Sequence, residues 1–392
     1  MFRSQKSSLQ TTSRLVLSVV LALAASALLS LPAAAQSATP NVGGNPANPN
    51  TNLVNATLVD ATPVDLISDI ANVGTNPATP DTNLVNPWGL AASPTGPWWV
   101  SDNGSGHATL YDGTGSPKPL VVSIPQWDGA PGGNPTGIVF NGTADFAIGG
   151  NATHFLFATE DGTIQGWSGG TSTVISPVNN FPNAVYKGLA LASAGGANYL
   201  YAANLRAGSV DVFDKTFQPH SFGPNAFLDF SMPAGYAPFN VANVGGGKLA
   251  VTYALQDGAK HDDVAGIGHG YVIIYDTQGK RLFRLQHVPY LNSPWAVVVA
   301  PARGFGAFGG DFLVGQFGSG AIVAYDSKGN FEGLLFDPAA LPLRINGLWG
   351  LGFGNGTGSG PTTTLYFTAG VFGEAHGIFG SITCCSAPPK TW

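Results

Sequence analysis

The stretch NPWGLA at residues 86–91 recurs about every fifty residues, a period that is typical of repeat architectures such as solenoids and propellers. Clear copies are NPTGIV at 134–139 and VYKGLA at 185–190. Weaker copies are APFNVA at 237–242, SPWAVV at 293–298 and GLWGLG at 347–352. The sequence therefore predicts one structural unit for each copy of this stretch.

Each copy is followed by further short strands that are separated by polar or Gly-rich turns. The second strand of a unit is aromatic and β-branched, as in WWV at 98–100 and FLF at 155–157. Several third strands end in a Tyr-Asp pair, as at 111–112, 275–276 and 325–326. Fourth strands are predicted at 120–124, 174–176, 226–230, 282–285 and 334–336. Short strands with regular turn signals indicate an all-β fold.

The composition agrees with this interpretation. Of the 392 residues, 54 are glycine, 44% are hydrophobic and only 10% are charged, which suits short strands and tight turns better than amphipathic helices. The formal net charge is −6, and the chain has no Lys/Arg run. We therefore expect no nucleic-acid partner, because the basic patch that binds phosphates is missing.

The N-terminal segment has the pattern of a signal peptide. Arg3, Lys6 and Arg14 flank or precede an apolar run at 15–31, and Ala33-Ala34-Ala35 provides a small-residue cleavage site. We expect cleavage after Ala35 and export to the periplasm or the medium; an uncleaved membrane anchor is the alternative. Residues 36–57 form an Asn/Pro/Thr-rich lead, and no later stretch has the about 18 consecutive apolar residues that span a membrane.

The last repeat lacks a fourth strand of its own, which residues 64–68 can supply from the N-terminal side. We therefore predict a six-bladed β-propeller over residues 58–383, closed by this N-terminal strand, because closure protects the edges of the sheets. Residues 384–392 form a short tail. Its adjacent Cys384 and Cys385 can form a vicinal disulfide, remain thiols, pair between chains or bind a soft metal.

The repeat resembles that of the NHL-type six-bladed propellers, in its Pro-x-Gly-Ile/Leu-Ala start and its Val-x-x-Tyr-Asp third strand. Over about residues 64–383 the chain is similar to an uncharacterised family of exported bacterial NHL-like propellers. That similarity rests on NLVNPWGL at 83–90, AAN at 202–204, APFNV at 237–241, KHDDV at 260–264, GHG at 268–270 and NGLWG at 346–350. The resemblance implies a propeller fold and an exported location, and it implies no established activity.

Propeller geometry predicts where a binding site lies. The first strand of each unit lines the axis, and its start opens on the same face as the turn between the second and third strands. Polar and aromatic side chains from these positions then surround one central mouth, as a small-ligand site requires. The ligand-binding candidates are Asn86, Trp88, Asn134, Tyr186, Asn204, Asn240, Trp295, Gln316 and Asn346.

The turn at 256–269 is the longest of these turns, and long loops on rigid scaffolds often carry function. The candidate catalytic residues are the imidazoles His261, His269 and His376. The candidate metal ligands are the carboxylates Asp102, Glu160, Asp262, Asp263 and Glu374. A mixed His/carboxylate set suits zinc, whereas carboxylates and carbonyls alone suit calcium. The alternative is that these acidic residues only cap turns.

Three functions fit these patterns. The first, which the sequence favours, is a binding or scaffold module whose mouth takes a small molecule, a glycan or an envelope protein. The second is a metal-dependent hydrolase or lyase, lactonase-like, with a divalent ion as Lewis acid. The third is a structural matrix component. GFGAFG at 304–309 is not followed by a helix, and no Gly-x-Ser-x-Gly elbow is evident, which argues against a phosphate loop and an α/β-hydrolase triad.

Overall fold

The computed structural model describes residues 57–73 and 80–384. These residues are β-strands and connections, with a short 3-10 helix, η2 (Gly306–Phe308). Within these two ranges, no helix is long and apolar enough to cross a membrane. The predicted signal peptide at 1–35, all of the predicted lead except its last residue, and Cys385 lie outside the described residues.

Four sheets consist of four antiparallel strands each. The first contains β2 (Pro87–Ala92), β3 (Trp98–Asp102), β4 (His107–Tyr111) and β5 (Val122–Ser123). The second contains β6 (Pro135–Phe140), β9 (Phe155–Thr159), β10 (Thr163–Trp167) and β11 (Ile175–Asn179). The third contains β12 (Tyr186–Ala194), β13 (Ala197–Asn204), β14 (Ser209–Phe213) and β15 (Pro219–His220). The fourth contains β16 (Tyr236–Gly245), β17 (Lys248–Leu255), β18 (Tyr271–Asp276) and β19 (Arg281–Arg284).

An eight-stranded sheet and a small hairpin complete the fold. One half of the large sheet contains β20 (Pro294–Val299), β21 (Phe312–Gln316), β22 (Ile322–Tyr325) and β23 (Phe331–Phe336). The other half contains β24 (Leu348–Phe353), β25 (Leu365–Val371), β26 (His376–Cys384) and the N-terminal β1 (Thr57–Ser68). The hairpin is formed by β7 (Ala147–Ile148) and β8 (Asn151–Ala152).

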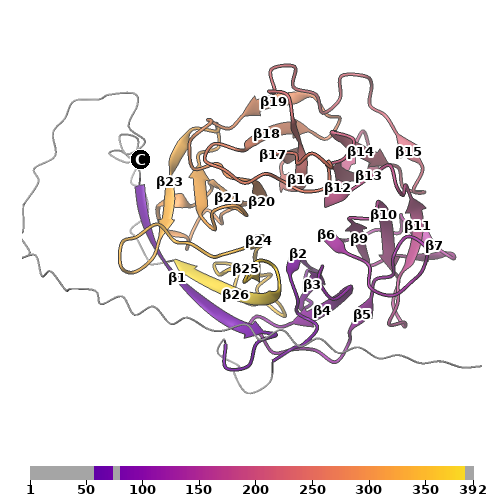
Figure 1. The fold of residues 1–392 in the computed structure, drawn as a ribbon, viewed down its shortest axis with the longest axis horizontal. Helices are drawn as coiled ribbons and strands as arrows, with labels where there is room; N and C mark the ends of the chain where they lie inside the picture. Colours follow the sequence, from indigo (N-terminus) through magenta and orange to yellow (C-terminus); the bar gives the residue numbers. More distant parts are fainter. Residues whose placement is uncertain (1–56, 74–79, 385–392) are drawn as a thin grey trace, which may run out of the picture. The chain divides into compact units, whose positions relative to one another are not determined.

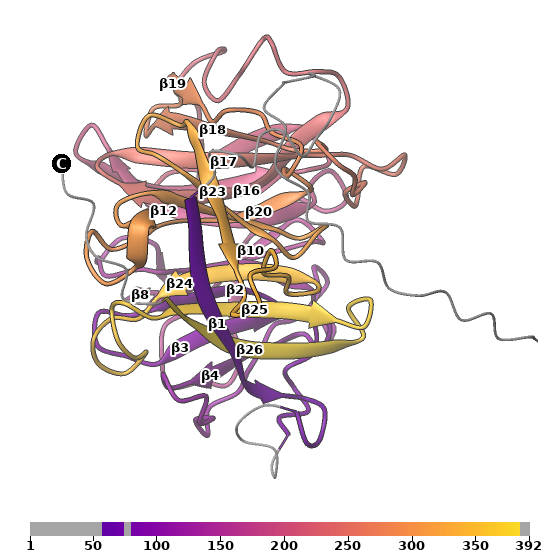
Figure 2. The same ribbon diagram turned by 90° about the vertical axis from the view of Figure 1, so that its left-hand side faces the viewer.

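Strand β1 joins the two halves of the eight-stranded sheet. Its first four residues pair with β23 in parallel, and residues 61–68 pair with β26 in the antiparallel sense. Figure 2 shows β1 in indigo, crossing from β23 to β26. The predicted pairing of residues 64–68 with the last strand of the chain is thereby confirmed.

The sheets are arranged like the blades of a propeller. The first strands β2, β6, β12, β16, β20 and β24 each contact the next in this order, and β24 contacts β2. Figure 1 shows these strands nearest the centre, with the other strands of each sheet further out. The described fold is therefore all-β and propeller-like.

The strands with continuous apolar sequences are buried on both faces between neighbouring sheets. All five residues of β3 and all five of β9 are buried. A cluster between two sheets contains Leu156 of β9, Leu189 of β12 and Leu200 of β13. Apolar runs such as WWV and FLF thus reflect packing of one sheet against the next, which is the physical reason for their lack of alternation.

The fourth strand predicted at 226–230 is wrong, because β15 takes that place in its sheet. Phe227 has a φ of 58°, in the left-handed region that strands do not use. Its ring is buried against Tyr201 and Tyr275. The segment is therefore apolar because it is a turn packed against the sheet, and not because it is a strand. The other predicted fourth strands overlap β5, β11, β19 and β23.

Candidate functional site

A cavity of about 440 Å³, the mouth pocket, lies where the inner strands begin. Its walls come from the starts of inner strands and from the turns between second and third strands. It is lined by Asn86, Trp88, Asn103, Glu160, His261, Asp262, Asp263, Ala265, Phe317, Trp349 and Glu374. The structure thus brings seven of the predicted site residues into one pocket: Asn86, Trp88, Glu160, His261, Asp262, Asp263 and Glu374.

Lys187 of β12 lies beneath the acidic side of this pocket, with 1% of its side chain exposed. Its ammonium donates hydrogen bonds to Oε1 of Glu160 and, at 2.8 Å, to Oδ1 of Asp262. It also lies 5.1 Å from the ring centroid of Trp88, within the range of a cation–π interaction. Burial lowers the pKa of Lys187, but the two carboxylates outweigh burial and raise it above its usual value. Lys187 is therefore a buried ammonium held by two acids.

A chain of hydrogen bonds holds the acidic side of the pocket in place. Asn103 donates to Oε2 of Glu160 at 3.0 Å, and Asn86 donates to Oδ1 of Asn103 at 3.3 Å. The indole of Trp349 donates to Oδ1 of Asn86 at 3.1 Å. The predicted residue Asn134 stands behind this chain and donates to the carbonyl of Asn103 at 3.2 Å. Such a connected network fixes the orientation of Glu160.

Aromatic rings form the floor of the mouth pocket. Trp88 stacks on Trp349 with ring centroids 3.6 Å apart, and Phe317 stacks on the same indole at 3.9 Å. Trp295 meets both indoles edge-on, at 6.1 and 5.7 Å. The rings of this floor are therefore packed closely against one another, and the three indoles are buried.

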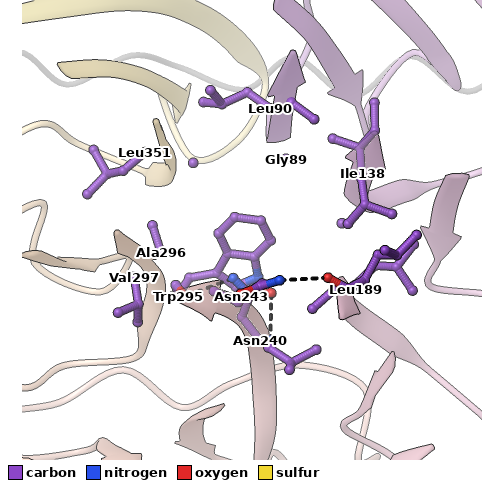
Figure 3. Close-up of a pocket in the computed structure, with 18 of the residues that line it drawn as sticks. Gly89, Leu90, Ile138, Leu189, Asn240, Asn243, Trp295, Ala296, Val297 and Leu351 are labelled. Carbon is purple, nitrogen blue, oxygen red and sulfur yellow. Dashed lines mark hydrogen bonds between the residues drawn. The ribbon is translucent and has the colours of Figure 1, made fainter. Parts of the chain in front are cut away.

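A second pocket of about 350 Å³ lies further along the inner strands. Figure 3 shows Trp295 and Asn240 among its walls, with small and aliphatic residues around them. Asn240 donates to the carbonyl of Trp295 at 2.9 Å, and the Trp295 indole donates to the carbonyl of Lys187 at 2.9 Å. Trp88 and Trp349 line the mouth pocket and Trp295 lines the second, so the indole cluster lies between the two.

The carboxyl groups of the mouth pocket differ in their acidity. Burial raises the pKa of Asp263, although Ser293 and Lys187 lower it in part. Burial also raises the pKa of Glu374, and the charges of Glu160 and Asp262 add to the rise. By contrast, the hydrogen bond from His261 and the charge of Lys187 hold the pKa of Asp262 well below its usual value.

His261 and Asp262 form a pair at the edge of the pocket. Nδ1 of His261 lies 3.1 Å from Oδ2 of Asp262, and this hydrogen bond raises the pKa of His261 above its usual value. Together with Glu160 they form a group whose candidate ligand atoms all lie within 4.8 Å of one another. This is the described arrangement closest to the metal site that the sequence predicted.

The other candidate histidines and Asp102 lie outside the lining of the mouth pocket. Nδ1 of His269 contacts the carbonyl of Val264 at 2.9 Å, which holds the imidazole within its own turn. Nδ1 of His376 contacts Asp69 at 2.8 Å, because β26 sits beside the N-terminal segment there. Asp102 is completely buried, and burial raises its pKa well above the usual value.

The remaining ligand candidates also make contacts elsewhere. Tyr186 and Asn204 both donate to Oδ2 of Asp211, at 3.0 and 2.9 Å. Gln316 is buried and accepts a hydrogen bond from the backbone N–H of Asn292 at 2.8 Å. Asn346 is exposed and does not line the mouth pocket. A position at a strand start or in a turn is thus not enough to place a side chain in the mouth pocket. β-Bulges and turn geometry set the direction of each side chain separately.

Lys187, Asn103 and Phe317 are site residues that the sequence interpretation missed. A signal for Lys187 was available: in VYKGLA it takes the place that Trp88 has in NPWGLA. The position is aromatic in four of the other five copies, so a lysine there is unusual in a chain with 10% charged residues. Such a buried cation needs acidic partners, which would have pointed to the neighbouring turns.

Comparison with known sequences finds relatives of this chain among viral proteins. It is 31% identical to the uncharacterised protein R648 of Acanthamoeba polyphaga mimivirus over 314 residues, which cover 76% of this chain and 74% of that protein. The uncharacterised protein L690 of the same virus is 30% identical over 322 residues, covering 76% of this chain and 79% of that protein. The chain belongs to the family of these two mimivirus proteins. No family model matches the chain.

Solved structures that resemble this family member include a streptogramin B lyase, with 12% identity, 83% of this chain and 97% of that chain covered, and a TM-score of 0.48. Regucalcin, a calcium-binding protein from Agrobacterium tumefaciens, has 11% identity, covers 85% of this chain and 97% of its own, and gives a TM-score of 0.49. These likenesses concern the fold alone. Because the matched relatives are viral, the bacterial and exported character that the resemblance implied stays a prediction.

Proposed function

We propose that the protein is a binding module whose mouth pocket holds a positively charged group of its ligand. The observation that supports this proposal is that the pocket has more carboxyl side chains than basic ones. Glu160, Asp262, Asp263 and Glu374 line it. Among the described residues, the basic side chains that form hydrogen bonds with these carboxylates are Lys187 and His261.

The acidity of the pocket supports this proposal. Burial raises the pKa values of Asp263 and Glu374, and Lys187 offsets this rise only in part. A cationic ligand would supply further positive charge. Aromatic walls with a few polar groups are also typical of small-ligand sites.

A metal-dependent hydrolase or lyase has weaker support. Zinc or calcium held by Glu160, His261 and Asp262 would lie against the Lys187 ammonium, which already binds both carboxylates. A metal-bound imidazole must also be neutral at its coordinating nitrogen, whereas Asp262 favours protonated His261. The group therefore does not fit a divalent ion while Lys187 keeps these contacts, and we derive no reaction through one.

We also infer that the propeller has six blades. This number follows if the eight-stranded sheet is counted as two blades that β1 joins, in addition to the four separate sheets. The ring of six first strands supports the same count. Cleavage after Ala35 and export belong to this proposal as well and rest on the sequence pattern alone.

Calorimetric titration of the full chain with three small probes tests the proposed function. Agmatine carries two positive charges, glucose is neutral and glutarate is anionic. We expect binding of agmatine alone, weakened about tenfold by Glu374→Gln, which removes one carboxylate from the pocket. Asp60→Asn makes the same charge change on an exposed residue of β1 and should have no effect. Binding of glucose or glutarate in preference to agmatine would overturn the proposal.

A further inference from the structure

The rim of the mouth pocket carries exposed apolar side chains from several separate turns. Phe372 is 74% exposed and Ile267 is 82% exposed, while Val264, Trp127 and Phe181 are each about 40% exposed. Single exposed apolar residues are ordinary, but a group of them around a polar pocket marks an interaction site. We call these five residues the apolar rim.

Sequence neighbours and contacts place the apolar rim beside the pocket. Phe372 is two residues from Glu374, Val264 directly precedes the lining residue Ala265, and Ile267 follows it by two positions. The backbone N–H of Trp127 donates to Asp161, the residue after Glu160, at 2.6 Å. The five residues therefore lie on turns that neighbour the acidic residues of the mouth pocket.

The aromatic pair in the apolar rim is held in a fixed position. Trp127 and Phe181 stack in parallel, with ring centroids 4.1 Å apart and an angle of 1° between the rings. Asn179 donates to the carbonyl of Trp127 at 2.8 Å. Rigid aromatic side chains lose little conformational entropy on binding, so this pair is preorganised as a contact surface.

The turn that carries Phe372 has an unusual backbone. Phe372 and Glu374 have φ values of 55° and 68°, and Gly373 between them has 66°. Residues other than glycine rarely adopt this conformation, and such strain is concentrated at binding and catalytic sites. Here it leaves the Phe372 ring exposed while Glu374 lines the pocket.

We propose that the mouth face docks a polypeptide segment that inserts an arginine or lysine side chain into the mouth pocket. This inference rests on the proposed function, because the charged head would meet Glu374, Asp263 and Asp262 there. The aliphatic stem of the inserted residue would pass the rim, and apolar neighbours in the segment would cover it. A central buried anchor inside a ring that excludes water is the usual arrangement of a protein-binding hot spot.

The acidic pocket and the exposed apolar side chains together favour this occupant over other ligands. A small amine would use the pocket but leave the apolar rim in water. A neutral glycan would cover the aromatic rings but would not balance the surplus of acid. A polypeptide with a basic residue among apolar ones matches both features.

An array of heptapeptides probed with the full chain tests the proposal. The central residue is Arg, Lys, Gln or Glu, and the flanking residues are either Leu and Phe or Ser and Gly. We expect binding to central Arg or Lys with apolar flanks, at least about tenfold tighter than to central Gln or to free arginine amide. Preference for central Gln or Glu, or equal binding with Ser and Gly flanks, would overturn the proposal.

Two variants separate the rim from the pocket. Ile267→Ser should weaken the peptide severalfold more than it weakens arginine amide, whereas Glu374→Gln should weaken both. Leu282→Ser, at a 42% exposed residue on the outer strand β19, is the matched control and should change neither. If arginine amide binds but no peptide gains affinity from apolar flanks, this inference fails and the proposed function stands. If neither binds, both fail.

Discussion

The ammonium of Lys187 lies 2.8 Å from the carboxylate of Asp262, although 75 positions separate the two residues in the chain. This contact joins an inner strand to the long connection between β17 and β18. It places a positive charge where the sequence pattern predicted a metal ion. The contact therefore helps to hold the loop and adds a positive charge beside the mouth pocket.

Replacing Lys187 by Met should destabilise the fold by about 3 kcal/mol, because Glu160 would remain as a largely buried charge without its partner. The free energy of unfolding in guanidinium chloride measures this loss. Adding Glu160→Gln to the Lys187→Met protein should recover part of the stability, since the unpaired charge is then removed. Equal free energies of unfolding for wild type and the single variant would show that the ion pair does not stabilise the fold.

Affinity for a cationic ligand should rise with pH. Asp263 and Glu374 have pKa values raised above 3.8 and 4.5, and His261 has a pKa raised above 6.5. Each deprotonation adds negative charge to the pocket or removes positive charge from it. Titrations with agmatine between about pH 4 and pH 8 check this trend. A fall in affinity over that range would contradict it.

The same carboxyl groups should make the folded state less stable as pH rises. Their folded pKa values lie above the unfolded ones, so the folded state binds more protons and its advantage is lost through this range. Comparing wild type with Glu374→Gln isolates one contribution. The variant should lose less stability than wild type between about pH 4 and pH 7. An identical pH profile in both proteins would count against a raised pKa at Glu374.

Trp349→Ala should destabilise the protein by about 3–5 kcal/mol, as is usual for removing a buried tryptophan. Trp349 is 1% exposed and stacks between Trp88 and Phe317. Trp349→Phe keeps part of the stacking but loses the hydrogen bond to Asn86, so its effect should be smaller. Chemical unfolding of the three proteins gives the order. A Phe variant as unstable as the Ala variant would argue against stacking as the main contribution.

The N-terminal strand should be essential for stability. Ile67 in β1 is fully buried in the cluster that contains Phe379 of β26, and Ile67→Ala should cost about 3 kcal/mol. Thr62 lies in the same strand but is exposed, so Thr62→Ala should change stability by less than about 0.5 kcal/mol. Thermal unfolding of both variants makes the comparison, and similar melting temperatures would contradict the structural role of β1.

The sequence predicted the fold better than the site. Repeats such as NPWGLA report the inner strands directly, because each copy meets the same packing environment. The pairing of residues 64–68 with β26 was also predictable from the missing strand of the last unit. The turn at Phe227 was not, because an apolar segment looks the same whether it is a strand or a packed turn.

Whether a residue lines the mouth pocket depends on the direction of its side chain, and the repeat pattern does not predict that direction. His261 and His269 belong to the same connection, yet only the first lines the pocket. Lys187 was missed because its role is visible only when the acids of two distant turns are placed beside it. Ion pairs between residues far apart in the chain are thus the feature of the site that could not be predicted from one sequence.

The most direct test of this account is whether Lys187 takes the place of a divalent ion. Untagged wild type and Lys187→Met, each checked for folding by circular dichroism, are titrated calorimetrically with zinc and with calcium at pH 7. We predict no stoichiometric binding by wild type, and one zinc ion per chain in Lys187→Met that is lost when His261→Ala is added. Stoichiometric zinc or calcium in wild type, removed by His261→Ala, would contradict the account.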